Sequence, residues 1–202
     1  MTSAAWKVCL FALTLALACT PTAQAEVEMM SPHEKTFASS FGSFTVGSQH
    51  EAINRIPPLN LMGTSREALI SGISYGRING PAIGVLKTGY HVGCAVSIGG
   101  TTLGLNPQVS VTTPGTQNGL PQAQVQAQPL LTVSLAAGEV KEVPLGQKEM
   151  APGRTVQIVM RDFHLTVNQC TGPVTLRQFA YVYAKSADVD DSGAVFGDPT
   201  WL

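Results

Sequence analysis

The chain has 202 residues, only 12% of them are charged, and its formal net charge is −1. It has no excess of Lys and Arg that could form a basic face, so a function in binding nucleic acid is excluded. The length suits a single domain, and the 20 Gly and 13 Pro that interrupt short apolar runs favour an all-β protein.

The N-terminus has the pattern of an export signal. Lys7 precedes the apolar run Val8–Ala18, and Ala23–Ala25 has the small-x-small pattern of a cleavage site. The apolar run is too short to cross a bilayer as a helix. We therefore predict a signal peptide at residues 1–25 and an exported mature protein. A lipoprotein acylated at Cys19 is the alternative, although the third residue before this cysteine is Ala16 and not the usual Leu.

Cleavage of the signal would leave two cysteines, Cys94 and Cys170. An isolated pair of cysteines in an exported protein most simply forms one disulfide. Two unpaired buried thiols are the alternative.

The first half of the mature chain contains weak signals. Residues 26–37 are polar and mixed, and we expect them to be loose, whereas the alternation in Phe41–Ser48 indicates a first strand. A Ser/Thr cap before the residues Arg-Glu-Ala-Leu predicts a short helical turn, which leads into a strand at Ile73–Arg77. Ala82–Gly100 is punctuated by glycine and is typical of one strand or a pair of strands.

The C-terminal part alternates clearly. In Arg154–Val167 the residues Val156, Ile158 and Met160 fall on one side, and Val174–Ser186 follows the same rule. Two long antiparallel neighbours joined by a tight loop favour a β-sandwich.

The centre of the chain carries no charge. Residues 92–138 contain no Asp, Glu, Lys, Arg or His, although the average composition would place five or six charged residues there. A low-complexity Pro/Gln linker is one explanation. The other is a segment whose surroundings, such as lipid, penalise charge.

Alternation decides between these explanations. Apolar residues occupy the odd positions from 103 to 111 and again from 123 to 135, and polar residues occupy most even positions; Gly104, Leu130 and Ala136 are the lapses. A linker has no reason to keep this parity through two runs. The polar residues that we predict to line a water-filled interior are Asn106, Gln108, Ser110, Thr112, Gln122, Gln124, Gln126 and Gln128.

Pairing of the two runs adds a constraint. Directly opposed residues of a hairpin share a face, so odd positions must pair with odd ones. A two-residue turn at Asn118-Gly119 would violate this rule, whereas a three-residue loop at Gln117–Gly119 satisfies it. The predicted pairs are Val111 with Val125, Val109 with Ala127, Pro107 with Pro129 and Leu105 with Leu131. Two paired prolines are awkward in a closed barrel, and we interpret them as a shared kink.

Each arm is long enough to cross a membrane as a strand. Leu103–Thr113 and Pro121–Ala137 contain 11 and 17 residues, and a tilted strand needs about 9–11. A single hairpin would expose unpaired backbone amides to lipid, so identical subunits must share the barrel, each contributing two strands. We predict one domain at residues 26–202, a β-sandwich with this hairpin inserted at about 101–137. The glutamines would face water, and the small apolar side chains would face lipid.

Five segments of the mature chain resemble the MspA-like porins, which lie in the outer membrane of mycolic-acid bacteria. No one of them is diagnostic, but their order and spacing together are fairly specific. The segments are Leu59–Pro81, Leu86–Gly100, Thr132–Leu145, Cys170–Val182 and the tail Val195–Leu202.

The resemblance implies a β-sandwich rim domain and a long hairpin, with eight copies forming a 16-stranded goblet. It implies passive diffusion of small hydrophilic solutes and ions, with outer-membrane lipid and further copies of the chain as partners. The cysteine pair is similar to that of family members that carry one. The best-known pore of the family has acidic residues at its constriction, whereas Thr113–Pro121 has no carboxylate. We therefore expect weak ion selectivity from a ring of Thr116, Gln117 and Asn118.

The alternative to a porin is a secreted or cell-envelope β-sandwich module that oligomerises or binds a partner without forming a pore, its hairpin serving as an assembly arm. An enzyme is disfavoured because no Ser lies in a G-x-S-x-G motif and no nucleophile has a visible base. The four histidines have no ligand-like spacing, so we expect no catalytic residue, no metal and no cofactor.

Overall fold

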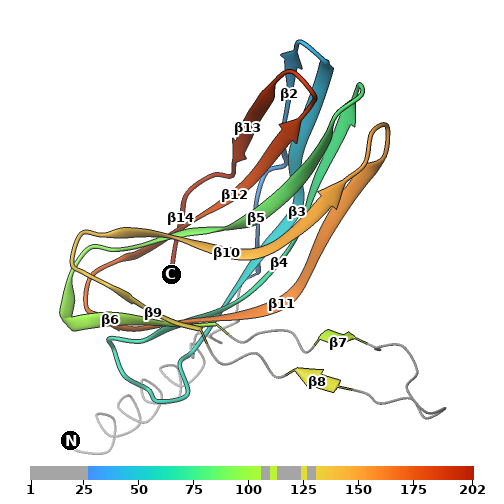
Figure 1. Ribbon diagram of the computed structural model, residues 1–202. Coiled ribbons are helices and arrows are strands. Elements are labelled where there is room, and N and C mark those ends of the chain that lie inside the picture. Colours follow the sequence, from blue (N-terminus) through green and yellow to red (C-terminus); the bar gives the residue numbers. More distant parts are fainter. Residues whose placement is uncertain (1–26, 106–109, 113–123, 127–130) are drawn as a thin grey trace, which may run out of the picture.

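Two antiparallel sheets face each other as a β-sandwich in the computed structural model, and a small two-stranded sheet lies beyond one end (Figure 1). The structure describes residues 27–105, 110–112, 124–126 and 131–202. The all-β fold with two sheets confirms the prediction of a β-sandwich.

The first sheet has seven strands. Its order is β1-β3-β4-β11-β6-β9, and β2 also pairs with β3, on residues 42–48, while β1 pairs with residues 52–54. The strands are β1 (Val27–Met29), β2 (His33–Ser39), β3 (Gly42–Ile56), β4 (Arg66–Asn79), β6 (Ser97–Leu105), β9 (Leu131–Leu135) and β11 (Thr155–Cys170).

The second sheet has five strands. Its order is β10-β5-β12-β13, and β14 pairs with the start of β12. The strands are β5 (Ile83–Cys94), β10 (Val140–Met150), β12 (Val174–Lys185), β13 (Asp190–Phe196) and β14 (Thr200–Trp201). The small third sheet pairs β7 (Ser110–Thr112) with β8 (Gln124–Gln126).

Alternation builds the sandwich. In β12 the even-numbered residues from Val174 to Ala184 are buried, while Arg177, Tyr183 and Lys185 are exposed. A strand with this period buries one face against the opposite sheet. In β11 the predicted face is confirmed, because Val156, Ile158 and Met160 pack against the core.

The core consists of two hydrophobic clusters. The cluster at the end where β6 and β9 lie contains Ile53, Val92, Leu165, Val167 and Leu176 among others. The cluster at the other end contains Phe44, Ile78, Leu86, Met150 and Val182 among others.

The first sheet bends midway along its long strands (Figure 1). The register shifts in β3 between Gln49 and Ala52 and in β11 between Met160 and Phe163. The bulged residues His50 and Asp162 have positive φ, 54° and 47°. Bulges of this kind increase the local bend of a strand.

Two expectations for the first half of the chain are wrong. The segment expected to be loose contains β1 and β2, which both pair with β3. The expected helical turn before Ile73 is instead the start of β4, because burial of Ala68 and Ile70 against the core follows the period of a strand. Tertiary packing outweighs the helix propensity of these residues.

The two long C-terminal strands were expected to be neighbours, but they lie in different sheets. β11 belongs to the first sheet and β12 to the second, and residues 171–173 cross between them. Each strand has one buried face, so stacking face to face across the core buries both. The alternative of a pair of strands in Ala82–Gly100 is confirmed, with β5 and β6 in different sheets.

Candidate functional site

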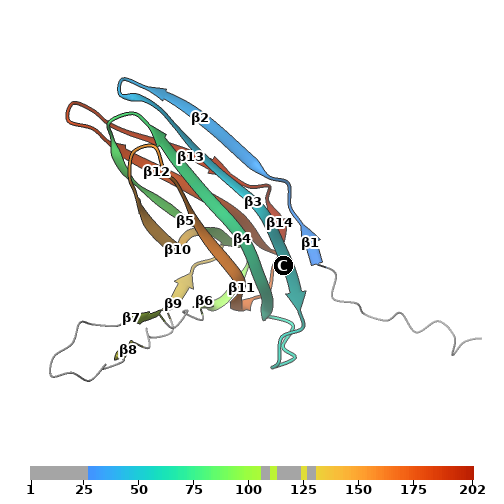
Figure 2. The ribbon, with the colours of Figure 1, turned by 90° about the vertical axis from the view of Figure 1, so that its right-hand side faces the viewer.

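The central segment leaves and re-enters the sandwich at one end of the molecule (Figures 1 and 2). The chain passes from the second sheet to the first between β5 and β6, and it returns between β9 and β10. We call the residues at these crossings, 94–97 and 135–140, the hairpin root.

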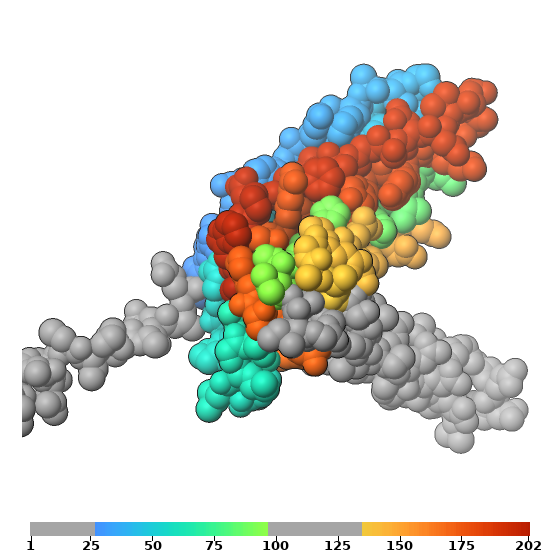
Figure 3. Space-filling view, turned by 90° about the vertical axis from the view of Figure 1, so that its left-hand side faces the viewer, coloured from blue at the N-terminus to red at the C-terminus, as the bar shows by residue number. Residues whose placement is uncertain are grey.

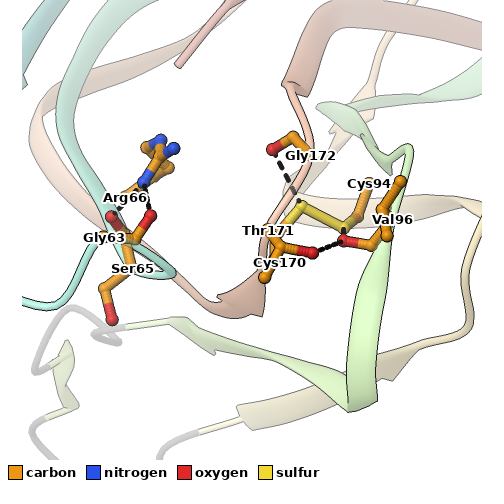
Figure 4. The surroundings of a disulfide bond; sticks show 8 residues. All are labelled: Gly63, Ser65, Arg66, Cys94, Val96, Cys170, Thr171 and Gly172. Carbon is orange, nitrogen blue, oxygen red and sulfur yellow. Dashed lines mark hydrogen bonds between the residues drawn. A yellow bond between two sulfur atoms is a disulfide. The ribbon is translucent and has the colours of Figure 1, made fainter.

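A disulfide closes the hairpin root. Cys94 at the end of β5 is bonded to Cys170 at the end of β11, with their Cα atoms 6.0 Å apart (Figure 4). This bond joins the two sheets, and it confirms the predicted pairing over the alternative of free thiols. The sequence separation of 76 encloses the whole central segment. Chain entropy predicts about 4–5 kcal/mol of stabilisation for a closed loop of this length.

Backbone hydrogen bonds fix the two crossings to each other. The amide of Gly138 donates to the carbonyl of Cys94 over 3.0 Å, and the amides of Thr171 and Gly172 donate to the carbonyl of Val96 over 2.9 and 3.2 Å. Gly138 has a φ of +74°, a conformation that favours glycine. The hairpin therefore leaves the sandwich from a rigid base.

The first part of each arm pairs within the first sheet of the sandwich. β6 pairs with β11, placing Leu105 opposite Leu165 and Leu103 opposite Val167, and both of these β11 residues are buried in the core. β9 pairs with the other edge of β6, and Leu135 at its end is 1% exposed. Leu135, where β9 joins the hairpin root, is therefore part of the core.

The predicted register is confirmed in both described parts of the hairpin. Leu105 pairs with Leu131 in β6 and β9, and Val111 pairs with Val125 in β7 and β8. The numbers of the paired residues have the same sum in both parts, so β7 and β8 keep the register that the sandwich sets. Even positions pair with even ones.

Four predicted pore-lining residues lie in the small sheet. Ser110 pairs with Gln126, and Thr112 pairs with Gln124. That these four residues line a pore stays a prediction. The other predicted site residues lie outside the described residues and also stay predictions, as do the signal peptide, the three-residue loop and the pairs Val109–Ala127 and Pro107–Pro129. These site residues are Asn106, Gln108, Thr116, Gln117, Asn118, Gln122 and Gln128.

A buried acid inside the sandwich was not predicted. Glu51 is 2% exposed, and the hydroxyl of Tyr90 donates to its Oε1 over 2.7 Å. Its Oε2 accepts no hydrogen bond, and a Cβ atom added at Gly197 would lie 3.1 Å from it. Burial raises the pKa of Glu51 to about 7, and burial together with the nearby carboxylate raises the pKa of Tyr90 well above its ordinary value.

Further polar side chains lie buried near Glu51. The hydroxyls of Ser74 and Thr88 are 2.7 Å apart, Thr88 donates to the carbonyl of Phe179, and the amide nitrogen of Gln178 donates to Ser74. The alternation of β3 gave no hint of the acid, because the bulge at His50 shifts the inward phase from even to odd positions. Counting by two along the sequence would have placed Glu51 outside.

In the part of the chain that the structure describes, no group of three or more His, Cys, Asp or Glu is placed to hold a metal ion. No helix among those residues has the length and apolar character needed to cross a membrane.

Comparison with known proteins gives one result. The model of the MspA family matches residues 42–200, well over half of the chain, and the comparison with curated proteins gave no match. The matched range includes both sheets except for β1, β2 and the last residues, and it spans the disulfide and the hairpin. The chain belongs to the MspA family.

Proposed function

We propose that this chain is the subunit of an outer-membrane porin, whose copies form a water-filled channel for passive diffusion of small hydrophilic solutes and ions. Membership of the MspA family supports a porin and a location in the outer membrane or cell envelope. The single observation that carries the proposal is the register of the hairpin.

That register separates the residues of the hairpin by polarity. Ser110 and Gln126 form one pair, and the next pair along the strands is Val111 and Val125. Directly paired residues share a face of the sheet, and successive pairs alternate between faces. One face of the hairpin is therefore polar without charge and the other is apolar, the pattern of a strand between a water-filled lumen and lipid.

The edges of the small sheet require further strands. Among the described residues, β7 and β8 pair only with each other. In lipid each unpaired backbone group costs several kcal/mol, so an open two-stranded sheet cannot cross the membrane alone. Closure by further copies of the chain satisfies these groups, and we propose a homo-oligomer, with the eight copies that the family resemblance implies.

The length of the free arms matches a membrane. With β6 and β9 assigned to the sandwich, the residues left on either side of the three-residue loop are 106–116 and 120–130, 11 in each arm. A tilted strand needs about 9–11 residues to cross. Arms of this length are long enough to cross a membrane.

The channel that we propose carries no fixed charge on its hairpins, because residues 92–138 contain none. A constriction formed by Thr116, Gln117 and Asn118 would offer hydroxyl and amide groups that hydrogen-bond to solutes. Ion selectivity in channels arises from rings of charge or of aligned dipoles. We therefore expect a weakly selective pore.

Recording from planar lipid bilayers tests this proposal. Purified mature protein is added to one side, and we expect discrete, long-lived and weakly selective conductance steps. Persistent silence from a preparation that is oligomeric in detergent would contradict the porin. That outcome would favour an envelope module without a pore, in which the hairpin serves as an assembly arm.

A further inference from the structure

The loop between β3 and β4 presents large apolar side chains to solvent. We call residues 57–65 the apolar loop. Its Leu59, Leu61 and Met62 are 93%, 85% and 57% exposed. The apolar loop projects from the end of the sandwich where β6 and β9 lie (Figures 1 and 2), and it forms the teal protrusion at the foot of the space-filling view (Figure 3). Clustered exposed apolar side chains mark surfaces that are covered in function.

The exposure is built into a fixed turn. Leu61 has a φ of 53°, in the left-handed region that a leucine rarely adopts. Its amide donates to the carbonyl of Pro58 over 2.9 Å, and the amide of Met62 donates to Oδ1 of Asn60 over 3.0 Å. Backbone strain of this kind persists only where neighbouring contacts impose it, and it clusters at functional sites.

The apolar loop is anchored to the strand that also carries the hairpin. The hydroxyl of Ser65 donates to Oδ1 of Asn168, and the amide of Cys170 donates to the carbonyl of Thr64, over 2.9 and 3.0 Å. This same end of β11 pairs with β6. Figure 4 shows Gly63, Ser65 and Arg66 on the ribbon beside Cys170.

The charge pattern suits a lipid surface. The apolar loop contains no charged residue, and the residue that follows it is Arg66. The guanidinium of Arg66 donates to the carbonyls of Gly63 and Ser65, which holds a cation at the base of the loop. A carboxylate lies there too, since the amide of Leu59 donates to Oε1 of Glu67 over 3.3 Å. Uncharged apolar side chains with charged groups at their base are typical of segments that lie at the boundary of lipid headgroups and acyl chains.

We propose that the apolar loop contacts the membrane surface next to the channel, with Leu59, Leu61 and Met62 reaching the boundary of headgroups and acyl chains. The inference rests on the proposed function, because it is the hairpin that brings this end of the sandwich to lipid.

A second copy of the chain is a poorer fit to the apolar loop. An apolar pocket of about 790 Å³, lined by Ile83, Met150 and Tyr183 among others, could receive a protruding turn, but it lies at the opposite end of the sandwich. A closed ring related by one rotation axis keeps the same end of every copy at the same level. The apolar loop of one copy therefore cannot reach this pocket of the next.

Quenching by brominated lipid tests the inference. Leu59→Trp is made in a mature chain that carries Trp201→Phe, so the new tryptophan is the only one, and the oligomer is inserted into phosphatidylcholine vesicles whose acyl chains carry bromine. We expect Trp fluorescence at position 59 to be quenched. Ile83→Trp in the same background is the matched control, because Ile83 is also exposed (61%) but lies at the other end. We expect no quenching there.

A third reporter, Val125→Trp, separates this inference from the porin itself. Quenching at 125 without quenching at 59 would overturn the lipid contact and leave the porin standing. No quenching at 125 would count against the porin, whatever position 59 shows. A blue-shifted emission from position 59 in lipid-free oligomer, with no quenching by brominated lipid, would show that a second copy covers the loop and would overturn the inference.

A second measurement does not depend on tryptophan. Leu59→Ser and Leu61→Ser should each lower the frequency of channel insertion about tenfold, equivalent to about 1.4 kcal/mol for a partly buried leucine. The conductance of each channel should not change, because the apolar loop lies outside the lumen. Ile83→Ser is the control and should insert like the unchanged protein. Equal insertion frequencies for all of these variants would contradict the lipid contact.

Discussion

The strand β12 and the small sheet of β7 and β8 both have the two-residue period of a β-strand. The two regions differ in what packs against them. In β12 the buried residues Ala180 and Val182 meet the opposite sheet of the same chain, and charged residues such as Arg177 and Lys185 occupy the other face. In β7 and β8 polar and apolar pairs alternate in the same way. No third strand among the described residues pairs with this small sheet, and none of its residues is charged. Alternation alone predicts a strand, and the proposed lipid contact of the hairpin accounts for its lack of charge.

The hairpin root lies between these two regions, the sandwich and the small sheet. Leu135 is buried in the core, and the β6–β9 pairs and the β7–β8 pairs share one register. The same parity that packs a leucine against the second sheet at the root would expose Val111 and Val125 beyond it. The lipid-facing side of the proposed barrel is thus an extension of the sandwich core.

The largest expected effect compares one charge in each region. Val182→Asp places a carboxylate at a site that is 0% exposed, which should cost more than about 4 kcal/mol and abolish folding. Val125→Asp should leave the sandwich folded and remove the channel, since a midplane charge costs up to about 2–4 kcal/mol per copy. Circular dichroism with thermal melting separates the two outcomes. Loss of folding in both variants would contradict this difference between the sandwich core and the small sheet.

Removal of the disulfide should weaken the base on which the hairpin stands. Replacing Cys94 and Cys170 together by Ser should lower the free energy of unfolding by about 4–5 kcal/mol, less any strain released. Denaturant unfolding of the oxidised and substituted proteins measures the difference. An unchanged midpoint would show that the backbone bonds at the root suffice.

The buried acid should make the sandwich less stable as pH rises. The pKa of Glu51 is raised to about 7, so the folded state holds its proton more tightly than the unfolded state, whose value is near 4.5. The stabilising contribution is complete below about pH 4.5 and is lost as pH rises through 7, a change on the order of 3 kcal/mol. The nearby His33 lowers the pKa of Glu51 and the nearby Asp198 raises it, both by less than burial does.

Glu51→Gln tests this linkage. It keeps an oxygen for the hydroxyl of Tyr90 and removes the titration, so its melting temperature should vary less between pH 5 and 8 than that of the unchanged protein. Thermal melting at several pH values gives the comparison. Parallel pH profiles for the two proteins would contradict the role of Glu51.

The smallest effect is expected at a surface ion pair. Lys87 lies 2.6 Å from Glu142, whose pKa is lowered chiefly by that hydrogen bond. Exposed pairs of this kind contribute about 0.2–1 kcal/mol. Lys87→Met should therefore shift the unfolding midpoint only slightly, and a loss as large as that of the disulfide would show that this face is not simply solvated.

Sequence reasoning succeeded where one period extends over many residues. The parity of residues 103–111 and 123–135 was enough to predict two pairs of the register, Leu105 with Leu131 and Val111 with Val125. It failed where the phase changes or the context decides. A bulge at His50 turns Glu51 inward, and pairing with β11 takes β6 into the first sheet. Neither event has a local signal, because both depend on strands distant in sequence.

The most direct test of the central claim is the ion selectivity of a matched pair of variants. Gln124→Asp and Val125→Asp introduce the same charge at adjacent positions of β8, whose partners are Thr112 and Val111. In bilayers under a salt gradient, we predict that Gln124→Asp forms channels whose reversal potential shifts toward cations and that Val125→Asp forms none. If the two variants behave alike, the hairpin has no water-facing side and no lipid-facing side, which would contradict the proposed porin.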